Sequence, residues 1–122
     1  MILKLSSLPR TWIIDLDGTI LKHNGYKDGK DELLKGVKEF FDIIPNEDTI
    51  IILTSRETKY TDQTINFLKQ NKIRYDHIIF NIPFGERILI NDKKESGLIT
   101  AYAINKERNS PFDIKFEIDE DL

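Results

Sequence analysis

Runs of consecutive apolar residues, separated by longer amphipathic stretches, constrain the fold of this chain more than any other feature. The runs at residues 12–16 and 49–53 are continuous rather than alternating, which is typical of strands buried on both faces of a sheet. In residues 33–44 and 60–71 the apolar side chains recur at spacings of three and four, which predicts a helix in each stretch. We expect further strands at 77–80, 87–90 and 100–104.

Strands that alternate with helices predict an α/β fold, because such crossover units build a mostly parallel central sheet with helices packed on it. We therefore expect a Rossmann-like three-layer sandwich, in which ligands bind at the carboxyl ends of the strands. The 122 residues suffice for one domain, with a core at about 10–105 and an acidic tail at 106–122. Within the tail, residues 112–118 alternate between apolar and polar side chains, so an edge strand, a subunit contact and a frayed end all stay open.

Composition excludes several classes of function. The chain has no cysteine and only two histidines, which excludes disulfides, thiol catalysis and cysteine-based zinc sites. No apolar run is long enough to span a bilayer, and we expect a soluble cytoplasmic protein. The net charge of −3 comes from residues 112–122, which carry −4 and leave +1 for the rest of the chain. Without a basic surface, neither nucleic acid nor a membrane is an expected partner.

The strongest chemical signal is the segment Asp15-Leu16-Asp17-Gly18-Thr19 at the end of the first predicted strand. An unpaired carboxylate is costly to bury, so two of them at a strand end imply something positive to bind. Side chains two residues apart in an extended segment face the same side, and Gly18 lets the backbone turn sharply. We therefore expect Asp15 and Asp17 to act on one reaction centre, with a solvated corner between strand and loop as the alternative.

This segment resembles the first motif of the haloacid dehalogenase (HAD) superfamily of phosphohydrolases. The resemblance implies that Asp15 is the nucleophile that forms an aspartyl-phosphate and that Asp17 is the general acid and base. Both roles suit a carboxyl group, which can attack phosphorus and can carry a proton. Gly18 and Thr19 are then expected to line the substrate site.

The second motif of the superfamily is a threonine or serine at the end of the next strand. Thr54 follows the run at 49–53 and, by the resemblance, donates a hydrogen bond to the transferring phosphoryl group. Ser55 and Arg56 are then close enough to contact substrate. Taken alone, Thr54 is typical of a helix cap, and Arg56 of a solvated helix start.

The fourth motif is acidic and binds Mg²⁺ together with the nucleophile. Asp92, after the run at 87–90, is the implied ligand, with Asn91, Asp15 and Asp17 contributing further oxygens. Carboxylate and amide oxygens are hard ligands of the kind that Mg²⁺ prefers. An ordinary Asn-Asp turn after a strand is the alternative.

The third motif is incomplete. Many small HAD phosphatases carry a lysine, often followed by proline, shortly before the acidic motif, whereas this chain has Ile82 before Pro83. The positive charge then comes from Arg87 or Lys93, or is missing. We favour Arg87 as the catalytic cation, and an ordinary surface pair of Glu86 with Arg87 is the alternative.

The resemblance covers residues 12–104 and leaves no room for a cap domain, because each interval between motifs holds only one helix and one strand. Capless HAD proteins accept large substrates or cover the site with a neighbouring subunit, so a homo-oligomer over the open site is one expectation. The Asn24-Gly25 pair also predicts a hairpin flap at residues 20–27.

The resemblance thus predicts a Mg²⁺-dependent phosphatase that hydrolyses a small phosphomonoester, with a sugar phosphate as the favoured substrate. A polynucleotide-end phosphatase and a weakly active HAD-like binding or regulatory protein are the alternatives. A signalling receiver domain of similar length is discounted. Its first strand would end in adjacent acids and a middle strand in the phosphorylated aspartate, where this chain has Thr54.

Overall fold

The structure is a computed structural model that describes residues 2–122. Its main sheet has three parallel strands in the order β2-β3-β4, namely β2 (Thr11–Asp15), β3 (Thr49–Leu53) and β4 (His77–Ile79). In the register of β2 and β3, Asp15 lies opposite Leu53, so both strands end at the same edge. The predicted α/β class is confirmed, and these strands lie within one residue of the predicted runs.

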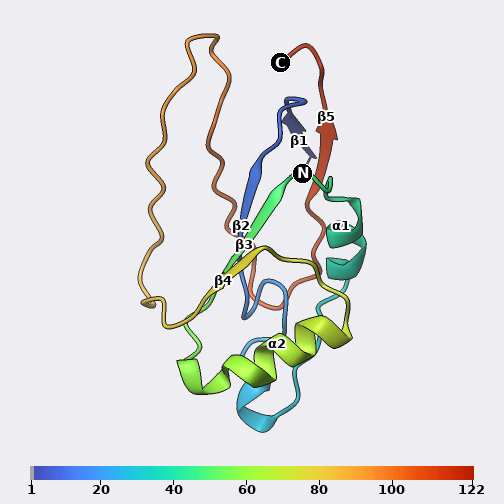
Figure 1. Cartoon of the computed structure of the whole chain (residues 1–122), viewed down its shortest axis with the longest axis vertical. Coiled ribbons are helices and arrows are strands. Elements are labelled where there is room, and N and C mark those ends of the chain that lie inside the picture. The colour runs from blue at the N-terminus through green and yellow to red at the C-terminus, as the bar shows by residue number, and fades with distance from the viewer. Residues whose placement is uncertain (1) are drawn as a thin grey trace.

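The two ends of the chain form a second, two-stranded sheet. β1 (Ile2–Leu5) pairs in parallel with β5 (Lys115–Ile118), as the upper part of Figure 1 shows. The tail is therefore a strand, one of the three alternatives left open, although its partner β1 was not predicted. Phe116 of β5 packs on Trp12 of β2 with ring centroids 5.1 Å apart, which ties the two sheets together.

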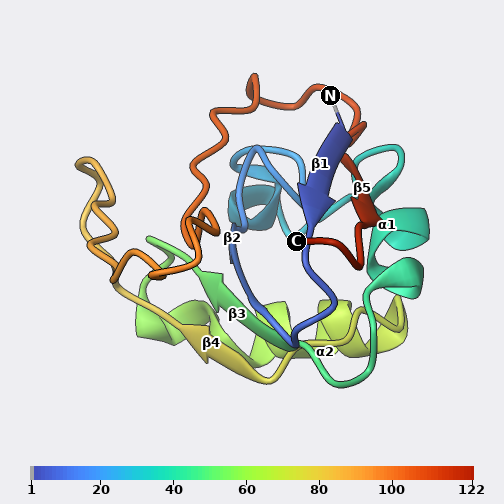
Figure 2. The ribbon, with the colours of Figure 1, turned by 90° about the horizontal axis from the view of Figure 1, so that it is seen from above.

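Two α-helices lie beside the two sheets (Figures 1 and 2). α2 (Thr61–Gln70) runs along the main sheet, and α1 (Val37–Ile43) lies beside β5 (Figures 1 and 2). Short 3₁₀ helices, η1 (Gly25–Asp28) and η2 (Thr58–Tyr60), precede α1 and α2 along the chain. Within residues 2–122, no helix has the length and apolar character needed to cross a membrane. The core is built from apolar side chains of both helices, the main sheet and the loops: Ile14, Leu16, Ile20, Leu21, Val37, Phe40, Phe41, Ile44, Ile50, Ile52, Leu68, Ile73 and Phe112.

α1 begins at Val37, four residues later than the periodicity predicts. Leu33 instead forms an antiparallel bridge with Leu21, and the amide of Leu34 donates to the carbonyl of Ile20 at 2.9 Å. Gly36 then has φ +90°, where a Cβ would collide with the carbonyl oxygen of Phe112. The later part of the apolar stripe at 33–44 forms a helix as predicted. Its first residues lie in a loop instead, because their pairing with residues 20 and 21 outweighs their helical spacing.

The predicted two-residue hairpin turn at Asn24-Gly25 is wrong. Asn24 is left-handed, with φ 61°, but Gly25 already belongs to the helical η1. A type I′ turn needs positive φ at both central residues, which this backbone does not have. The flap is a wider loop, closed by the hydrogen bond from the amide of Lys22 to the carbonyl of Glu32 at 2.9 Å.

Residues 84–104, called the arm here, replace the two further strands predicted at 87–90 and 100–104. The arm extends from the end of β4 and returns, with its tip far from the main sheet (Figures 1 and 2). Hydrogen bonds from Asn91 and Thr100 join its two limbs. Only seven residues, 80–86, separate β4 from the predicted strand, whereas a parallel crossover usually takes a dozen or more. The apolar runs therefore find no place in the sheet of their own chain.

Candidate functional site

The candidate site lies where β2 and β3 end. Leu16 is fully buried in the core, so the flanking Asp15 and Asp17 are turned out of it. The carbonyl of Leu16 accepts hydrogen bonds from the amides of Thr19, Ile20 and Leu21, which closes a tight turn. The turn needs the positive φ of Gly18, +84°. Local sequence thus places two carboxylates at the carboxyl edge of the sheet, as predicted.

Asp15 is half-exposed and accepts a hydrogen bond on each carboxylate oxygen. The hydroxyl of Thr19 donates to Oδ2 at 2.9 Å, and Nη1 of Arg87 donates to Oδ1 at 2.7 Å. Arg87 reaches Asp15 from the base of the arm, and both side chains are about one third exposed, at 35% and 36%. The cation favoured from the sequence therefore lies against the predicted nucleophile, whereas Lys93 lies in the exposed arm.

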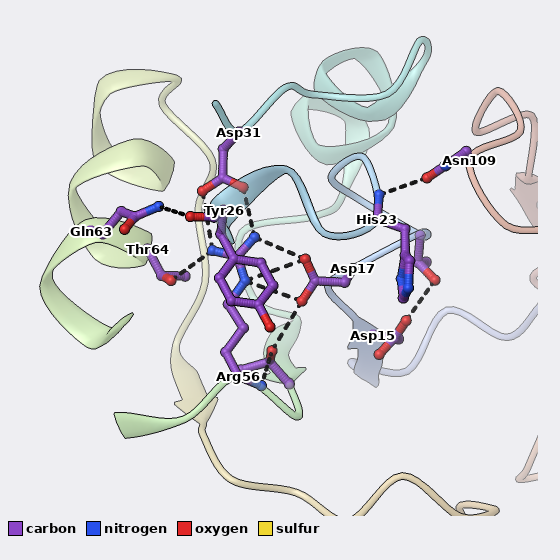
Figure 3. A network of polar contacts seen from close by, with 11 residues as sticks. Asp15, Asp17, His23, Tyr26, Asp31, Arg56, Gln63, Thr64 and Asn109 are labelled. Carbon is purple, nitrogen blue, oxygen red and sulfur yellow. Dashed lines mark hydrogen bonds and ion pairs between the residues drawn. The ribbon is translucent and has the colours of Figure 1, made fainter. Parts of the chain in front are cut away.

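Asp17 is held by Arg56, which also binds a second carboxylate (Figure 3). Nη2 of Arg56 lies 2.9 Å from Asp17 Oδ1, and its Nε donates to Oδ2 at 3.1 Å. On its other side the guanidinium donates to both oxygens of Asp31, at 2.7 and 3.1 Å. Such paired geometry makes these the strongest ionic contacts of the site. Sequence reasoning missed Asp31, since nothing near it in the chain signals a partner.

Arg56 is 1% exposed, which corrects both sequence interpretations of it: it is neither a solvated helix start nor open to substrate. Nη1 donates to the hydroxyl of Thr64 on α2 at 2.8 Å. The ring of Tyr26 covers the guanidinium, with Cζ 4.2 Å from the ring centroid. Burial alone would lower the pKa of Arg56, but the hydrogen bonds that it donates to Asp17 and Asp31 outweigh this effect and raise the pKa. Arg56 is therefore a permanent cation.

Tyr26 lies next to Arg56 and Asp17, which affect the pKa of its hydroxyl. Burial raises the pKa of its hydroxyl, and the negative charge of Asp17 raises it further. Gln63 of α2 donates to the backbone carbonyl of Tyr26 at 3.0 Å, which anchors the flap to the helix (Figure 3). Tyr26 therefore stays neutral, and its ring covers the guanidinium of Arg56.

Thr54 and Ser55 follow β3 directly. Thr54 is fully buried; its Oγ1 accepts from the amide of Arg56 at 3.1 Å and lies 3.5 Å from Asp17 Oδ2. This hydroxyl thus faces Asp17, and the burial of Thr54 argues against the direct phosphoryl contact that the sequence predicted for it. Ser55 lines an open cavity next to the site.

Gly18 is covered by a loop that the sequence analysis did not connect with it. Its carbonyl accepts from the amide of Asn109 at 2.9 Å, and a Cβ on it would come within 3.1 Å of Arg108. Lys106 Nζ donates to the carbonyl of Ser110, and burial lowers the pKa of this lysine. Gly18 therefore permits close approach of the chain itself rather than of substrate.

A cavity of about 560 Å³, a size that suits a small molecule, is lined by Ser55 and the flap, whereas Asp15, Asp17 and Arg87 are not among its lining residues. Polar, basic and aromatic side chains share its wall: His23, Asn24, Tyr26, Lys27, Ser55, Glu57, Tyr60, Asn81, Ile82, Pro83, Phe84 and Arg108. Tyr26 joins this cavity to the Arg56 cluster, because its ring also covers the guanidinium. The flap therefore forms one wall of a pocket.

The predicted magnesium ligands are not brought together. Asp92 and Asn91 lie in the exposed arm, where Thr100 is their hydrogen-bonding partner. Among residues 2–122, no three acidic or histidine side chains cluster as ligands of a metal ion would. Asp15 and Asp17 alone remain at the carboxyl edge, so this arrangement does not fit the magnesium site expected from the resemblance.

Comparison with known proteins gives one structural relative. No protein-family model matches the chain, and no curated protein matches it. One chain of a solved structure described as the Pnkp1/Rnl/Hen1 complex aligns with a TM-score of 0.53 and 28% identity. The alignment covers 67% of the present chain. It covers only 31% of the other one. The present chain is thus similar to a part of a much longer protein.

Proposed function

We propose that this chain is a phosphomonoester hydrolase in which Asp15 is the nucleophile. The observation that carries the proposal is the pair of carboxylates at the carboxyl end of β2, each hydrogen-bonded to its own arginine. Two carboxyl groups beside arginines match what covalent phosphoryl transfer needs: an attacking oxygen, a proton carrier and cations for the phosphate charge.

In the proposed reaction, a carboxylate oxygen of Asp15 attacks phosphorus and the bond to the leaving oxygen breaks. Each Asp15 oxygen accepts one hydrogen bond and so keeps a free lone pair. The product of this step is an aspartyl-phosphate, which water then hydrolyses to inorganic phosphate and free Asp15. Arg87, bound to Asp15, is placed to stabilise the negative charge of the transferring group.

Asp17 is proposed to protonate the leaving oxygen and later to take the proton of the attacking water. Both its oxygens accept hydrogen bonds from Arg56, so a proton on Asp17 displaces one of these contacts. Because Arg56 also binds Asp31, it retains a carboxylate partner while Asp17 is protonated. Thr54 is fully buried and its hydroxyl faces Asp17 Oδ2 at 3.5 Å, so its proposed role is to position Asp17 rather than to contact the phosphoryl oxygens.

Membership in the HAD superfamily, with a Rossmann-like three-layer core and no cap domain, is part of the proposal. Its support is the parallel order β2-β3-β4 with Asp15 and Thr54 at the strand ends. Mg²⁺ is the cofactor that this membership implies, and it supplies positive charge to the phosphate when bound. No step above is derived through it, because Asp92 is not placed with Asp15 and Asp17.

The favoured substrate is a sugar phosphate. Ser55, Asn24, Asn81 and Glu57 in the pocket wall are hydrogen-bonding groups suited to sugar hydroxyls, and Tyr60 offers an aromatic face. A polynucleotide-end phosphatase is the second candidate, and the likeness to a chain of the Pnkp1/Rnl/Hen1 complex is the observation that favours it.

The test is phosphate release by the purified chain, measured with Mg²⁺ and with EDTA. The panel holds sugar phosphates and oligonucleotides phosphorylated at the 3′ or the 5′ end. We expect Mg²⁺-dependent release, with kcat/KM highest for a sugar phosphate. Preference for an oligonucleotide would select the second candidate. Absence of turnover on the whole panel would overturn the enzymatic proposal and favour a binding protein.

Arg87→Ala is expected to lower kcat/KM about 10- to 100-fold, because a hydrogen bond to a charged group is worth roughly 1.5–3 kcal/mol. Lys93→Ala is the matched control, a cation removed from the exposed arm, and should change kcat/KM less than about twofold. Steady-state kinetics on the best substrate measures both. Equal losses in the two variants would remove Arg87 from the catalytic site.

A further inference from the structure

The arm leaves large apolar side chains in solvent. Phe84, Ile88 and Ile90 are 93%, 82% and 89% exposed. Further along the arm, other large side chains are at least one third exposed: Leu89, Ile99, Tyr102 and Ile104. Monomeric proteins rarely expose an apolar patch this long, and such patches usually mark an interaction surface.

The main sheet offers a matching open edge. Among residues 2–122, β2 pairs with β3 on one side and with no strand on the other. Ile13 in the middle of β2 is half-exposed, although the run of apolar residues around it is typical of a strand buried on both faces. An open edge presents unpaired N–H and C=O groups, which is a template for one more strand.

We propose that the arm of one copy of this chain adds a strand to the β2 edge of a second copy, reciprocally, so that the protein is an arm-exchanged dimer. The segment at 87–90 is the added strand. It cannot easily pair with its own β2, because the seven residues after β4 are too few for the usual parallel crossover. A second copy removes this restriction, and reciprocal exchange gives a closed two-fold assembly.

The size and charge of the arm suit such an interface. A stable interface uses about 20–30 residues on each side. The arm has 21 residues, 84–104, and exchange makes each contact twice. Its charged side chains are three acids and three bases, so two arms do not repel each other: Glu86, Arg87, Asp92, Lys93, Lys94 and Glu95. The apolar run Ile88-Leu89-Ile90 then loses much of its exposure to solvent.

The exchange also brings the separated carboxylates together. A strand at 87–90 that runs parallel to β2 carries Asp92 to the carboxyl end of β2, where Asp15 of the other copy lies. The carboxylates that one chain keeps apart would thus meet between two chains. This consequence, unlike the dimer itself, rests on the proposed function.

Sedimentation velocity over a range of protein concentrations tests the dimer. Wild type should sediment as a dimer, and Ile90→Lys as a monomer. Because Ile90 is 89% exposed in the single chain, this substitution removes no buried contact within it, and an unchanged far-UV circular dichroism spectrum will show that the fold is intact. Ile43→Lys, at a 59% exposed position on α1, is the matched control and should stay dimeric. Wild type that is monomeric at every concentration overturns the proposal.

Disulfide trapping locates the contact, because the chain has no cysteine of its own. Ile13→Cys and Ile90→Cys chains, distinguished by tags of different size, are refolded together and oxidised. A mixed disulfide between them is the expected product, and Ile43→Cys with Ile90→Cys should give none. A dimer without the mixed disulfide would overturn the β2 edge as the docking place. A disulfide within a monomeric doubly substituted chain would show that the arm folds back on its own β2, which also overturns the exchange.

Discussion

Asp15→Asn is expected to lower kcat/KM at least about 10³-fold, because an amide oxygen does not replace the carboxylate as a nucleophile toward phosphorus. The fold should be unaffected. Asp15 is partly exposed, and its ion pair with Arg87 is of a kind that contributes about 0–1 kcal/mol. Phosphate release on the best substrate, together with the thermal midpoint of the variant, measures the two effects separately.

Asp62→Asn is the control for Asp15→Asn. Asp62 is an exposed carboxylate in the first turn of α2, and its loss should leave kcat/KM within about twofold of wild type. Turnover that survives Asp15→Asn would contradict the assignment of Asp15 as the nucleophile. A loss of stability as large as the one expected below for Arg56→Met would instead point to a structural role.

Arg56→Met is expected to lower the free energy of unfolding by about 3–5 kcal/mol, the range seen when one partner of a buried ion pair is removed. Methionine fills much of the arginine volume but leaves the carboxylates of Asp17 and Asp31 without their cation. Leaving Asp31 without a cation costs more stability than leaving Asp17 without one, because the side chain of Asp31 is 1% exposed and that of Asp17 is 16% exposed. Urea denaturation followed by circular dichroism gives the free energy.

Two further variants separate the charge of Arg56 from its geometry. Arg56→Lys keeps a cation but loses the forked contacts, so its stability should fall between wild type and Arg56→Met. Lys59→Met removes a cation from the exposed pair with Glu57, whose side chains are 65% and 69% exposed, and should cost less than about 1 kcal/mol. If Arg56→Met costs no more than Lys59→Met, the buried triad does not stabilise the fold.

The strands of the main sheet could be predicted because their signal is local. Three consecutive isoleucines in β3 predict burial on both faces; the structure buries Ile50 and Ile52 on one face and leaves Ile51, on the other, partly exposed. The same reasoning failed for 87–90, where an equally apolar run lies in the exposed arm. A run of apolar residues indicates that a segment is stable only when it is buried. Whether it can pair with the sheet of its own chain depends on the length of the loop that connects them.

The sequence predicted those residues of the candidate site that are placed by their neighbours in the chain, and not those placed by distant residues. Asp15 and Asp17 lie where a strand turns into a loop, and the burial of Leu16 between them follows from alternation. The role of Arg56 could not be predicted, because its interpretation as a substrate contact ignored a carboxylate from another part of the chain. Asp31, 25 positions earlier, encloses it with Asp17.

The sequence by itself determined the positions of β2, β3, β4 and α2 and the two carboxylates at the end of β2, since these depend on the order of neighbouring side chains. Only the tertiary structure decided which distant groups meet: β1 with β5 from the two ends of the chain, and Asp31 with Arg56. Such contacts require loops to close against an entropic cost, and they form where the packing of the whole chain repays it. The balance between loop-closure entropy and packing therefore cannot be inferred from a local sequence pattern.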